Sequence, residues 1–516
     1  MIEGYVARES VTAGERLALH VSTDAREFRV RFYRLGRSLE FIAESEVFPG
    51  VLKAPPPHPD GVAGSASPAV DWDFPAYHLD TSADWPPGIY LAHLVPGEAA
   101  HARSVPRLGD GDVEGFEREF FVLRPRRPGA HGRILYKKST FTRHAYNRSD
   151  GADVQRAASL YDNPVYDGGG ADGGRRGHRL SMRRPGGVID LAYWDAPFIA
   201  WLERCGYAVE YCTDLDLHED PGLLAPYDLL LSVGHDEYWS AAMREHTAAH
   251  LAAGGNVAFL SANTCWWRVH LTDGDTAFVS DTDHHVAGVF PHLPATDQWW
   301  APPPRGVGEP ENALTGVSFR NGGMWPSTEW PGDRPREGYR VQHADHWAYA
   351  GTGLRDGSDG GPVDALGAGT PLIGYECDGA AFAYDELGVA RATGADGTPS
   401  SFLILGIHVL SPVHEDFHHP KWGHWNCVER EPGATGPRAA TMGVHTVDGG
   451  GTVFTAGTTD WPVVCGREED AGVVRVTRNV LDRLARRADR PSDPGPDRPS
   501  DPGPDRPSGP GPTAGP

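Results

Sequence analysis

Three ionisable side chains, His235, Asp236 and Glu237, follow directly on a largely apolar run at residues 227–234. Such a run predicts a strand buried on both faces, and parallel sheets bind ligands just beyond the carboxyl ends of such strands. We therefore expect the chemistry of this protein at this place in the chain. The alternative is a helix N-terminus, where acids only complement the helix dipole and Ser240 caps the helix. Of the three side chains, Asp236 fits this alternative best.

Strands and helices alternate around this motif, which is the pattern of a parallel sheet with crossover helices. Gly206 is placed to end one helix in the left-handed conformation. The predicted strands span 133–136, 208–212, 227–234, 256–261, 371–376, 401–406 and 451–457, and the predicted helices run from Asp195 to Arg204, from Ser240 to Ala253 and from Val473 to Arg487. Neighbouring strand ends would bring His235, Glu237 and Asn263 to one crevice.

The 516 residues exceed what one ordinary core accommodates, so we expect more than one domain. Residues 1–125 alternate apolar and polar positions, which predicts an Ig-like β-sandwich. The α/β domain then spans 130–488, with a layout like that of class I glutamine amidotransferases. Within it, the Gly-, Pro- and Trp-rich stretch at about 272–370 predicts a long irregular insertion that packs over the sheet as a lid. Residues 489–516 repeat a Pro-, Asp- and Gly-rich pattern that predicts disorder.

Composition narrows the partners and the location. The formal net charge of −23 argues against nucleic acid or an anionic membrane and favours a small neutral substrate. Six cysteines without a C-x-x-C pair, and an N-terminus without signal-peptide features, favour a reduced cytoplasmic protein. No apolar run is long enough to predict a membrane span. The sequence leaves open whether the chain forms a homo-oligomer or needs a small partner subunit.

Other segments could also carry chemistry. Tyr146, Tyr161 and Tyr166 lie in a polar, Gly-rich stretch, in which tyrosines are mostly packing residues. The histidines between 414 and 424 could bind a divalent metal, but their spacing matches no strong zinc pattern, and a solvated loop is the alternative. Cys265 follows a strand end, as the nucleophile of glutamine amidotransferases does, without their Gly-x-Cys-x-Gly turn. A buried structural cysteine is the alternative there.

Taken together, several motifs resemble the large (beta) subunit of N,N-dimethylformamidase and its relatives. The resemblance covers roughly 130 to 485, and residues before it look like the β-sandwich ahead of that domain. It is carried by residues 144–147, 159–162, 231–240, 259–263 and 453–461. The resemblance implies an amidohydrolase with one mononuclear iron held by two tyrosines and a glutamate. Carried over by motif, the ligands are Tyr146, Tyr161 and Glu237, with Tyr166 as the competitor of Tyr146.

Physical reasoning agrees with this ligand set once it is proposed. Two phenolates and a carboxylate bring three negative charges, which ferric iron neutralises, and hard oxygen donors suit that ion. The resulting hypothesis is hydrolysis of a C–N bond by water that the iron acidifies. Asn263 would donate a hydrogen bond to the developing charge, His235 would carry a proton to the leaving amine, and Glu376 would act as a further acid or base.

Three alternatives to this hypothesis stay open. A non-catalytic protein could bind carbohydrate or another ligand through the β-sandwich and exposed tryptophans. A hydrolase could use Cys265 as its nucleophile, and an iron could serve redox chemistry. The chain is shorter than the large subunit of the namesake enzyme, so the substrate is an amide whose identity the sequence does not give.

Overall fold

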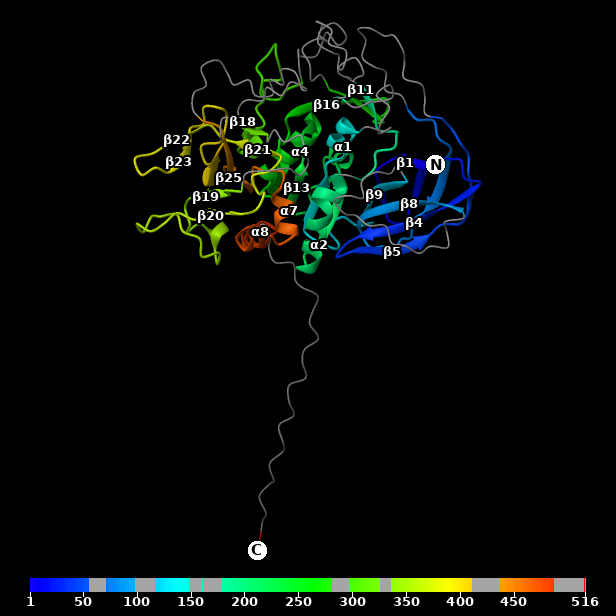
Figure 1. Ribbon diagram of the computed structural model, residues 1–516, viewed down its shortest axis with the longest axis horizontal. Helices are drawn as coiled ribbons and strands as arrows, with labels where there is room; N and C mark the ends of the chain where they lie inside the picture. The colour runs from blue at the N-terminus through cyan, green and yellow to red at the C-terminus, as the bar shows by residue number, and fades with distance from the viewer. Residues whose placement is uncertain are drawn as a thin grey trace.

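The computed structural model describes residues 1–54, 71–97, 117–147, 160, 179–188, 190–280, 297–324, 336–410, 437–486 and 515. Within them the chain is a mixed α/β protein with several sheets (Figure 1). The N-terminal strands lie at one end of the molecule and the strands β19 to β25 at the other, with β13 and the helices α1, α2 and α4 between them. The described part contains no helix long and apolar enough to cross a membrane.

The N-terminal strands form two sheets that share one apolar cluster. Phe28, Val30 and Phe32 of strand β4 join that cluster, whereas Tyr33 and Leu35 face the other side and pack with the core of the main sheet. One sheet has the order β1 (Ile2–Val6), β3 (Arg16–Thr23), β7 (Ala76–Asp80); the other has the order β2 (Ser10–Thr12), β9 (Arg118–Arg124), β8 (Gly88–Pro96), β4 (Glu27–Leu35), β5 (Leu39–Glu44), with β6 (Phe48–Pro49) beside β4. The Ig-like topology and the domain boundaries stay predictions.

The main sheet has nine strands and is half parallel. Its first five strands pair in parallel and the following strands pair antiparallel, so the fully parallel sheet expected from the sequence holds only for the first half. The order is β12 (Val209–Thr213), β10 (Ile134–Lys138), β13 (Leu229–His235), β15 (Asn256–Ala262), β26 (Thr452–Thr455), β25 (Ala439–Thr446), β24 (Leu403–Val409), β19 (Tyr339–Val341), β20 (Ala365–Leu366). The amidotransferase-like layout stays a prediction.

Helices cover both faces of this sheet, which is why β13 carries buried apolar side chains on both sides. Leu229, Leu231 and Val233 face one apolar cluster and Leu230 faces the other. The first face carries α2 (Ala196–Arg204), α7 (Trp461–Gly466) and α8 (Ala471–Leu484), and the second carries α1 (Thr140–Tyr146), α3 (Asp214–Glu219) and α4 (Ala241–Ala252).

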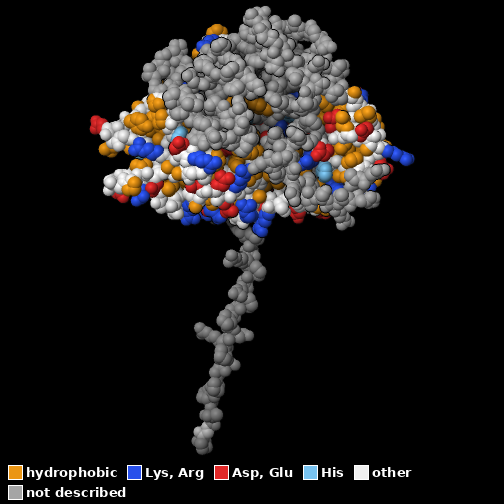
Figure 2. Space-filling model, viewed as in Figure 1, with side chains coloured by type: hydrophobic (Ala, Val, Ile, Leu, Met, Phe, Trp, Pro, Cys, Tyr) orange, Lys and Arg blue, Asp and Glu red, His pale blue; other side chains and the backbone are white. Residues whose placement is uncertain are grey.

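Smaller elements surround the ends of the strands. They are β11 (Arg179–Ser181), β17 (Ala277–Val279), β16 (Trp267–Thr272) and β14 (Tyr238–Ser240) in one sheet, the pairs β18 (Ser318–Met324) with β21 (Glu376–Gly379) and β22 (Phe382–Tyr384) with β23 (Ala390–Ala392), the π-helix Leu191–Asp195, the short helix α5 (Asn312–Thr315) and the 3-10 turn Trp347–Tyr349. Figure 2 shows acidic and basic side chains intermingled on the described part of the visible face.

Several local predictions are confirmed and others are wrong. Ser240 caps α4 through Met243 N, and Gly206 has a φ of +80° after α2. Asp195 precedes α2 but does not cap it, because the chain is already helical there, as the π-helix Leu191–Asp195 runs into α2; its carboxylate accepts from Tyr136. The strand expected at 371–376 begins only at Glu376, since the backbone before it turns.

The segment 272–370 is not wholly an insertion outside the sheet. Strands β19 and β20 lie within it and form the edge of the main sheet. Its role as a lid stays a prediction. The tail at 489–516 falls outside the described residues except for one position.

Candidate active site

The motif that ends β13 is shaped by Gly234. This residue has a φ of +75°, a conformation that favours glycine. A Cβ at this position would lie 2.7 Å from Cγ of Trp194, so the absence of a side chain lets the indole ring pack against the strand. The chain can therefore turn out of the sheet at His235 while an aromatic ring covers the turn.

Four side chains from three separate elements meet at this turn. Tyr146, the last residue of α1, donates a hydrogen bond of 2.7 Å from Oη to Oε2 of Glu237. Nε2 of His235 lies 3.2 Å from the same Oε2 and 2.9 Å from Oε2 of Glu376 on β21. His235, Glu237 and Glu376 are buried, so their charges interact with little screening by water. The sequence-predicted residues His235, Glu237, Glu376 and Tyr146 thus form one cluster.

The two carboxylates control the protonation of the histidine. Burial alone lowers the pKa of His235, but the close carboxylates of Glu376 and Glu237 outweigh it and raise the pKa to about 10. Burial also raises the pKa of Glu376, and the charge of His235 opposes that shift. In the protein without a bound ion, an imidazolium therefore lies between two acids at neutral pH.

Asn263 reaches the cluster from the end of β15. It has a φ of +49°, and its backbone N–H donates to Oδ1 of Asp378 at 2.7 Å, which holds this strained turn. Its side-chain amide lowers the pKa of Glu376, while its Oδ1 is buried without a hydrogen-bond partner among the described residues. Asn263 therefore favours the charged form of Glu376 and keeps one acceptor unused.

Aromatic rings surround His235. The ring centroids of Tyr146, Trp194 and Tyr375 lie 5.1, 5.9 and 6.2 Å from that of the imidazole. Sequence reasoning missed Trp194, because it lies on a π-helix that no periodicity announces, although such turns occur frequently at functional sites. It also missed Tyr375, whose position beside Glu376 was the available signal.

Asp236 is not the helix-start residue that the sequence suggested, because α4 begins only at Ala241. Its carboxylate instead accepts from the fully buried Lys137 at 2.7 Å, and Lys137 also donates to Asp214 at 2.5 Å. Asp236 is thus one of two counter-ions of a buried lysine beneath the site. Sequence reasoning missed this network, since Lys137 lies near the end of a mainly apolar strand, where a lysine is expected to face solvent.

Helix α1 is tied directly to the backbone of Glu237. Oγ1 of Thr142 accepts hydrogen bonds from the N–H groups of Glu237 at 2.9 Å and Tyr238 at 3.2 Å. The first turn of the same helix is held by Oδ2 of Asp214, which accepts from Phe141 N at 2.8 Å. These contacts bring the helix that carries Tyr146 against the strand end that carries Glu237.

The other sequence candidates divide into two groups. Tyr161, Tyr166 and the histidine-rich segment 414–424 lie outside the described residues. Cys265 is fully buried, and burial raises the pKa of its thiol. Since a nucleophilic cysteine needs a lowered pKa and access, this environment does not favour the thiol hydrolase considered from the sequence.

The donors present can be tested against an iron site. No group of three His, Cys, Asp or Glu side chains in the described ranges is arranged to hold a metal ion. Tyr146 Oη and Glu237 Oε2, however, are 2.7 Å apart. Two adjacent oxygen ligands on one octahedral ion with bonds of about 2.0–2.1 Å are separated by about 2.9 Å. Their spacing and hard oxygen chemistry therefore fit two of the three ligands that the resemblance implies.

Comparison with known proteins agrees with the resemblance noted from the motifs. Residues 28–469 match the family model described as N,N-dimethylformamidase beta subunit-like, C-terminal. The chain belongs to this family. The match covers the N-terminal strands from β4 onward as well as the main sheet, so both parts are common to the family.

Two curated relatives are similar over most of this chain. The N,N-dimethylformamidase beta subunit of Paracoccus aminophilus is 27% identical over 424 residues, which are 72% of this chain and 51% of the relative. That of an Alcaligenes species is 26% identical over 415 residues, which are 71% of this chain and 50% of the relative. The chain thus spans about half the length of the curated relatives it matches.

Proposed function

We propose that this chain is an amide hydrolase that cleaves a C–N bond at the site beyond β13 with the help of iron. The observation that carries the proposal is the pairing of Tyr146 with Glu237 next to the couple formed by His235 and Glu376. One half of this arrangement supplies oxygen ligands and the other supplies proton carriers. Membership in a family named after an amide hydrolase supports the reaction class.

Tyr146, Tyr161 and Glu237 would hold the iron. Tyr161 follows Leu160, whose backbone N–H donates to the carbonyl of Ala145 at 2.9 Å, next to Tyr146 on α1. This contact brings residue 160 beside α1, and the role of Tyr161 itself rests on the family motif. Bound iron would supply Lewis acidity, which lowers the pKa of water and polarises a carbonyl oxygen.

The remaining side chains of the site would move the protons. Oε2 of Glu376 would take a proton from the attacking water, whose oxygen forms the new bond to the carbonyl carbon. Nε2 of His235 lies 2.9 Å from Oε2 of Glu376. It would give a proton to the leaving nitrogen as the C–N bond breaks. The proton accepted by Glu376 would then restore the imidazolium, and the products are a carboxylic acid and an amine. General acid–base help of this kind contributes about 10²- to 10⁴-fold to a rate.

Asn263 and the aromatic rings would prepare the site for this proton transfer. The amide of Asn263 would stabilise the charged form of Glu376, and its unpartnered Oδ1 would offer an acceptor for the substrate or for water. Tyr146, Trp194 and Tyr375 exclude water from His235 and suit a small neutral amide. Since both relatives are named beta subunits, a partner subunit is part of the proposed assembly.

Amine release in the absence of oxygen tests the proposal, because hydrolysis needs no oxygen. Iron-loaded protein would be assayed with formamide, N-methylformamide, N,N-dimethylformamide and acetamide. We expect release from at least one amide, and a kcat lower by about 10²- to 10⁴-fold in Glu376→Gln with iron content unchanged. The matched control is Glu210→Gln, a buried glutamate at the opposite ends of the strands, bound to Tyr227 and the backbone at 129 and 131.

Two results would contradict the proposal. The first is no amine from any of these amides with fully iron-loaded protein, alone or with a co-purified partner subunit. The second is equal release by the parent and Glu376→Gln. A loss of activity in Glu210→Gln as large as in Glu376→Gln would show that any buried glutamate has this effect.

A further inference from the structure

Helix α1, which carries Tyr146, cannot hold its own position. It has seven residues, and a helix of this length is unstable without tertiary contacts. Its side chains from Thr140 to Ala145 are buried, so the surrounding elements determine where Tyr146 lies. On one side these elements belong to the main sheet, through Asp214 and Thr142. On the other side they belong to the N-terminal strands.

Arg143 makes the contact with the N-terminal strands. Its guanidinium donates to Oε1 of Glu9, which lies between β1 and β2, and to Oε1 of Glu119 on β9. The guanidinium carbon lies 4.5 Å from the ring centroid of Phe120, also on β9. Nε2 of the adjacent His144 lies 3.2 Å from the same oxygen of Glu9. The guanidinium of α1 thus binds two acids of the N-terminal strands, and the neighbouring imidazole lies against one of them.

The C-terminal end of α1 is bound by the segment around Arg184, and Glu119 also contacts this segment. Arg184 donates to the carbonyls of His144 at 2.9 Å and Asn147 at 3.3 Å, at the helix C-terminus where intrahelical donors run out. Two residues later, Gly186 N donates to Oε2 of Glu119 at 3.3 Å. Glu119 therefore contacts both the helix and the segment that covers its last turn.

The ion pairs of Arg143 carry a large desolvation cost. Glu119 and Arg143 are buried, and removing charges from water costs several kcal/mol for each ion before pairing offsets it. Adhesion between the two parts does not need them, because Tyr33, Leu35 and Leu91 of the N-terminal strands already join the apolar cluster of the main sheet. Other ion pairs join the N-terminal strands to α2 and α3, through Arg34 with Glu203 and Arg8 with Glu219. Those of Glu9 and Glu119 fall on the helix whose last residue faces Glu237.

We infer that Glu9 and Glu119 of the N-terminal strands, acting through Arg143, are positioning residues for Tyr146. The N-terminal strands are then part of the active site in the sense that they fix where one of its phenols lies. The geometric statement stands on the contacts of α1. Its consequence for iron rests on the function proposed above.

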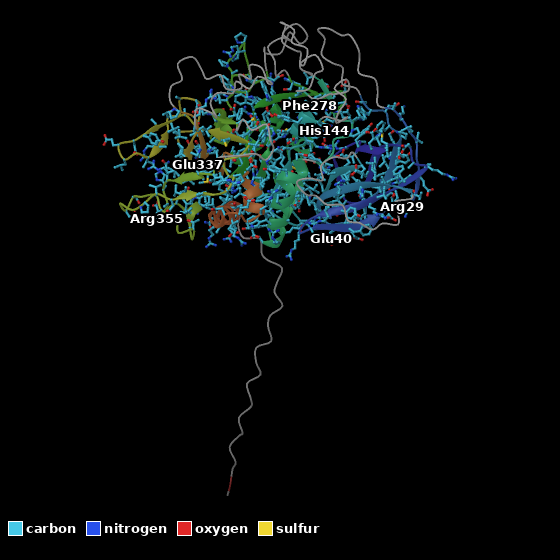
Figure 3. All side chains as sticks on the ribbon, in the orientation of Figure 1. Arg29, Glu40, His144, Phe278, Glu337 and Arg355 are labelled. Atoms are coloured by element: carbon cyan, nitrogen blue, oxygen red, sulfur yellow. The ribbon has the colours of Figure 1, made fainter. Side chains whose placement is uncertain are left out.

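Hydrogen exchange of α1 tests this inference with the full chain. The variant is Glu9→Gln, which keeps the size of the side chain and removes the charge that faces Arg143 and His144. The matched control is Glu44→Gln on β5, another acid of the N-terminal strands, which accepts from Arg29 and Arg31. Figure 3 shows Arg29 at the outer edge of the N-terminal strands, far from His144.

The expected result is local. At pH 8, above the pKa of Glu119, which burial raises to about 7, the amides of residues 139–147 should exchange about tenfold faster in Glu9→Gln than in the parent. Strand β3, remote from α1, should keep its protection, and Glu44→Gln should leave α1 unchanged. Iron affinity should fall by about tenfold in Glu9→Gln and not in Glu44→Gln.

A second set of variants distinguishes a local effect on α1 from general unfolding. Arg143→Lys keeps the charge but cannot bind both acids through a planar fork, so we expect exchange of α1 between that of the parent and that of Arg143→Met. Exchange of α1 in Glu9→Gln equal to that in Glu44→Gln would overturn the inference. If the parent binds no iron, the proposed function fails while the exchange result still decides the positioning role.

Discussion

Replacing Thr142 by valine removes one oxygen from beneath the site and almost nothing else. The two side chains have nearly the same shape, and Thr142 is buried, so the packing of α1 should be preserved. What is lost is the acceptor for the N–H groups of Glu237 and Tyr238. These two groups lie at the turn that presents Glu237, where water has little access.

The size of the effect follows from this geometry. A buried donor left without a partner costs about 1–3 kcal/mol. Two donors share one oxygen here, and the bond of 3.2 Å to Tyr238 is the weaker, so we expect a loss of about 3 kcal/mol in the free energy of unfolding. Because the same bonds fix Glu237 relative to Tyr146, about 1.4 kcal/mol of this loss should appear as tenfold weaker iron binding.

Urea unfolding and chelator competition measure the two quantities, and Thr247→Val is the matched control. Thr247 is also fully buried, but its hydroxyl only donates to the carbonyl of Met243 within α4, so its loss should cost about 1 kcal/mol or less. The reasoning is refuted if Thr142→Val and Thr247→Val lose equal stability, or if Thr142→Val binds iron as tightly as the parent.

Three further predictions follow from other parts of the site and core. Lys137→Met leaves the buried acids Asp214 and Asp236 without their shared cation and should cost about 3–5 kcal/mol in urea unfolding; a loss below 1 kcal/mol would contradict the buried ion pairs. Burial lowers the pKa of His445 from 6.5 to about 4. Its neutral form therefore contributes stability that is present above pH 6.5 and is lost, by up to about 3 kcal/mol, as the pH falls to about 4. His445→Gln should reduce the difference between the free energies of unfolding at pH 7 and pH 4.5, and an unchanged difference would be evidence against this. Cys265→Ser should keep its amide hydrolysis within about tenfold of the parent, whereas a loss beyond 10³-fold would restore the thiol mechanism.

The sequence predicted the strand ends of the site well because burial leaves a simple trace there. The run before His235 is apolar on both faces since helices cover both sides of β13, and its register beside β15 brings Asn263 toward the same edge. Glu237 and His235 follow from that position alone. Tyr146 and Tyr161 needed the family resemblance, because tyrosines in a loop carry no periodic signal.

What the sequence did not predict depends on contacts between distant residues. The partner of Asp236 is Lys137, on a different strand, and no pattern around either residue announces the pair. The antiparallel half of the main sheet was not predicted for a related reason. An apolar run predicts a strand but not whether the neighbouring strand runs parallel or antiparallel to it. Trp194 was hidden by the π-helix that carries it. A cytoplasmic location stays a prediction.

Iron content together with the visible absorption spectrum tests the central claim most directly. Phenolate bound to ferric iron absorbs visible light, so protein loaded with iron should contain about one iron per chain and be coloured. Tyr146→Phe and Tyr161→Phe should each weaken or shift the absorption band, and Glu237→Gln should lose most of the iron, while the buried control Glu210→Gln keeps both. A colourless, iron-free protein after loading, or a band that neither tyrosine variant changes, would contradict the account.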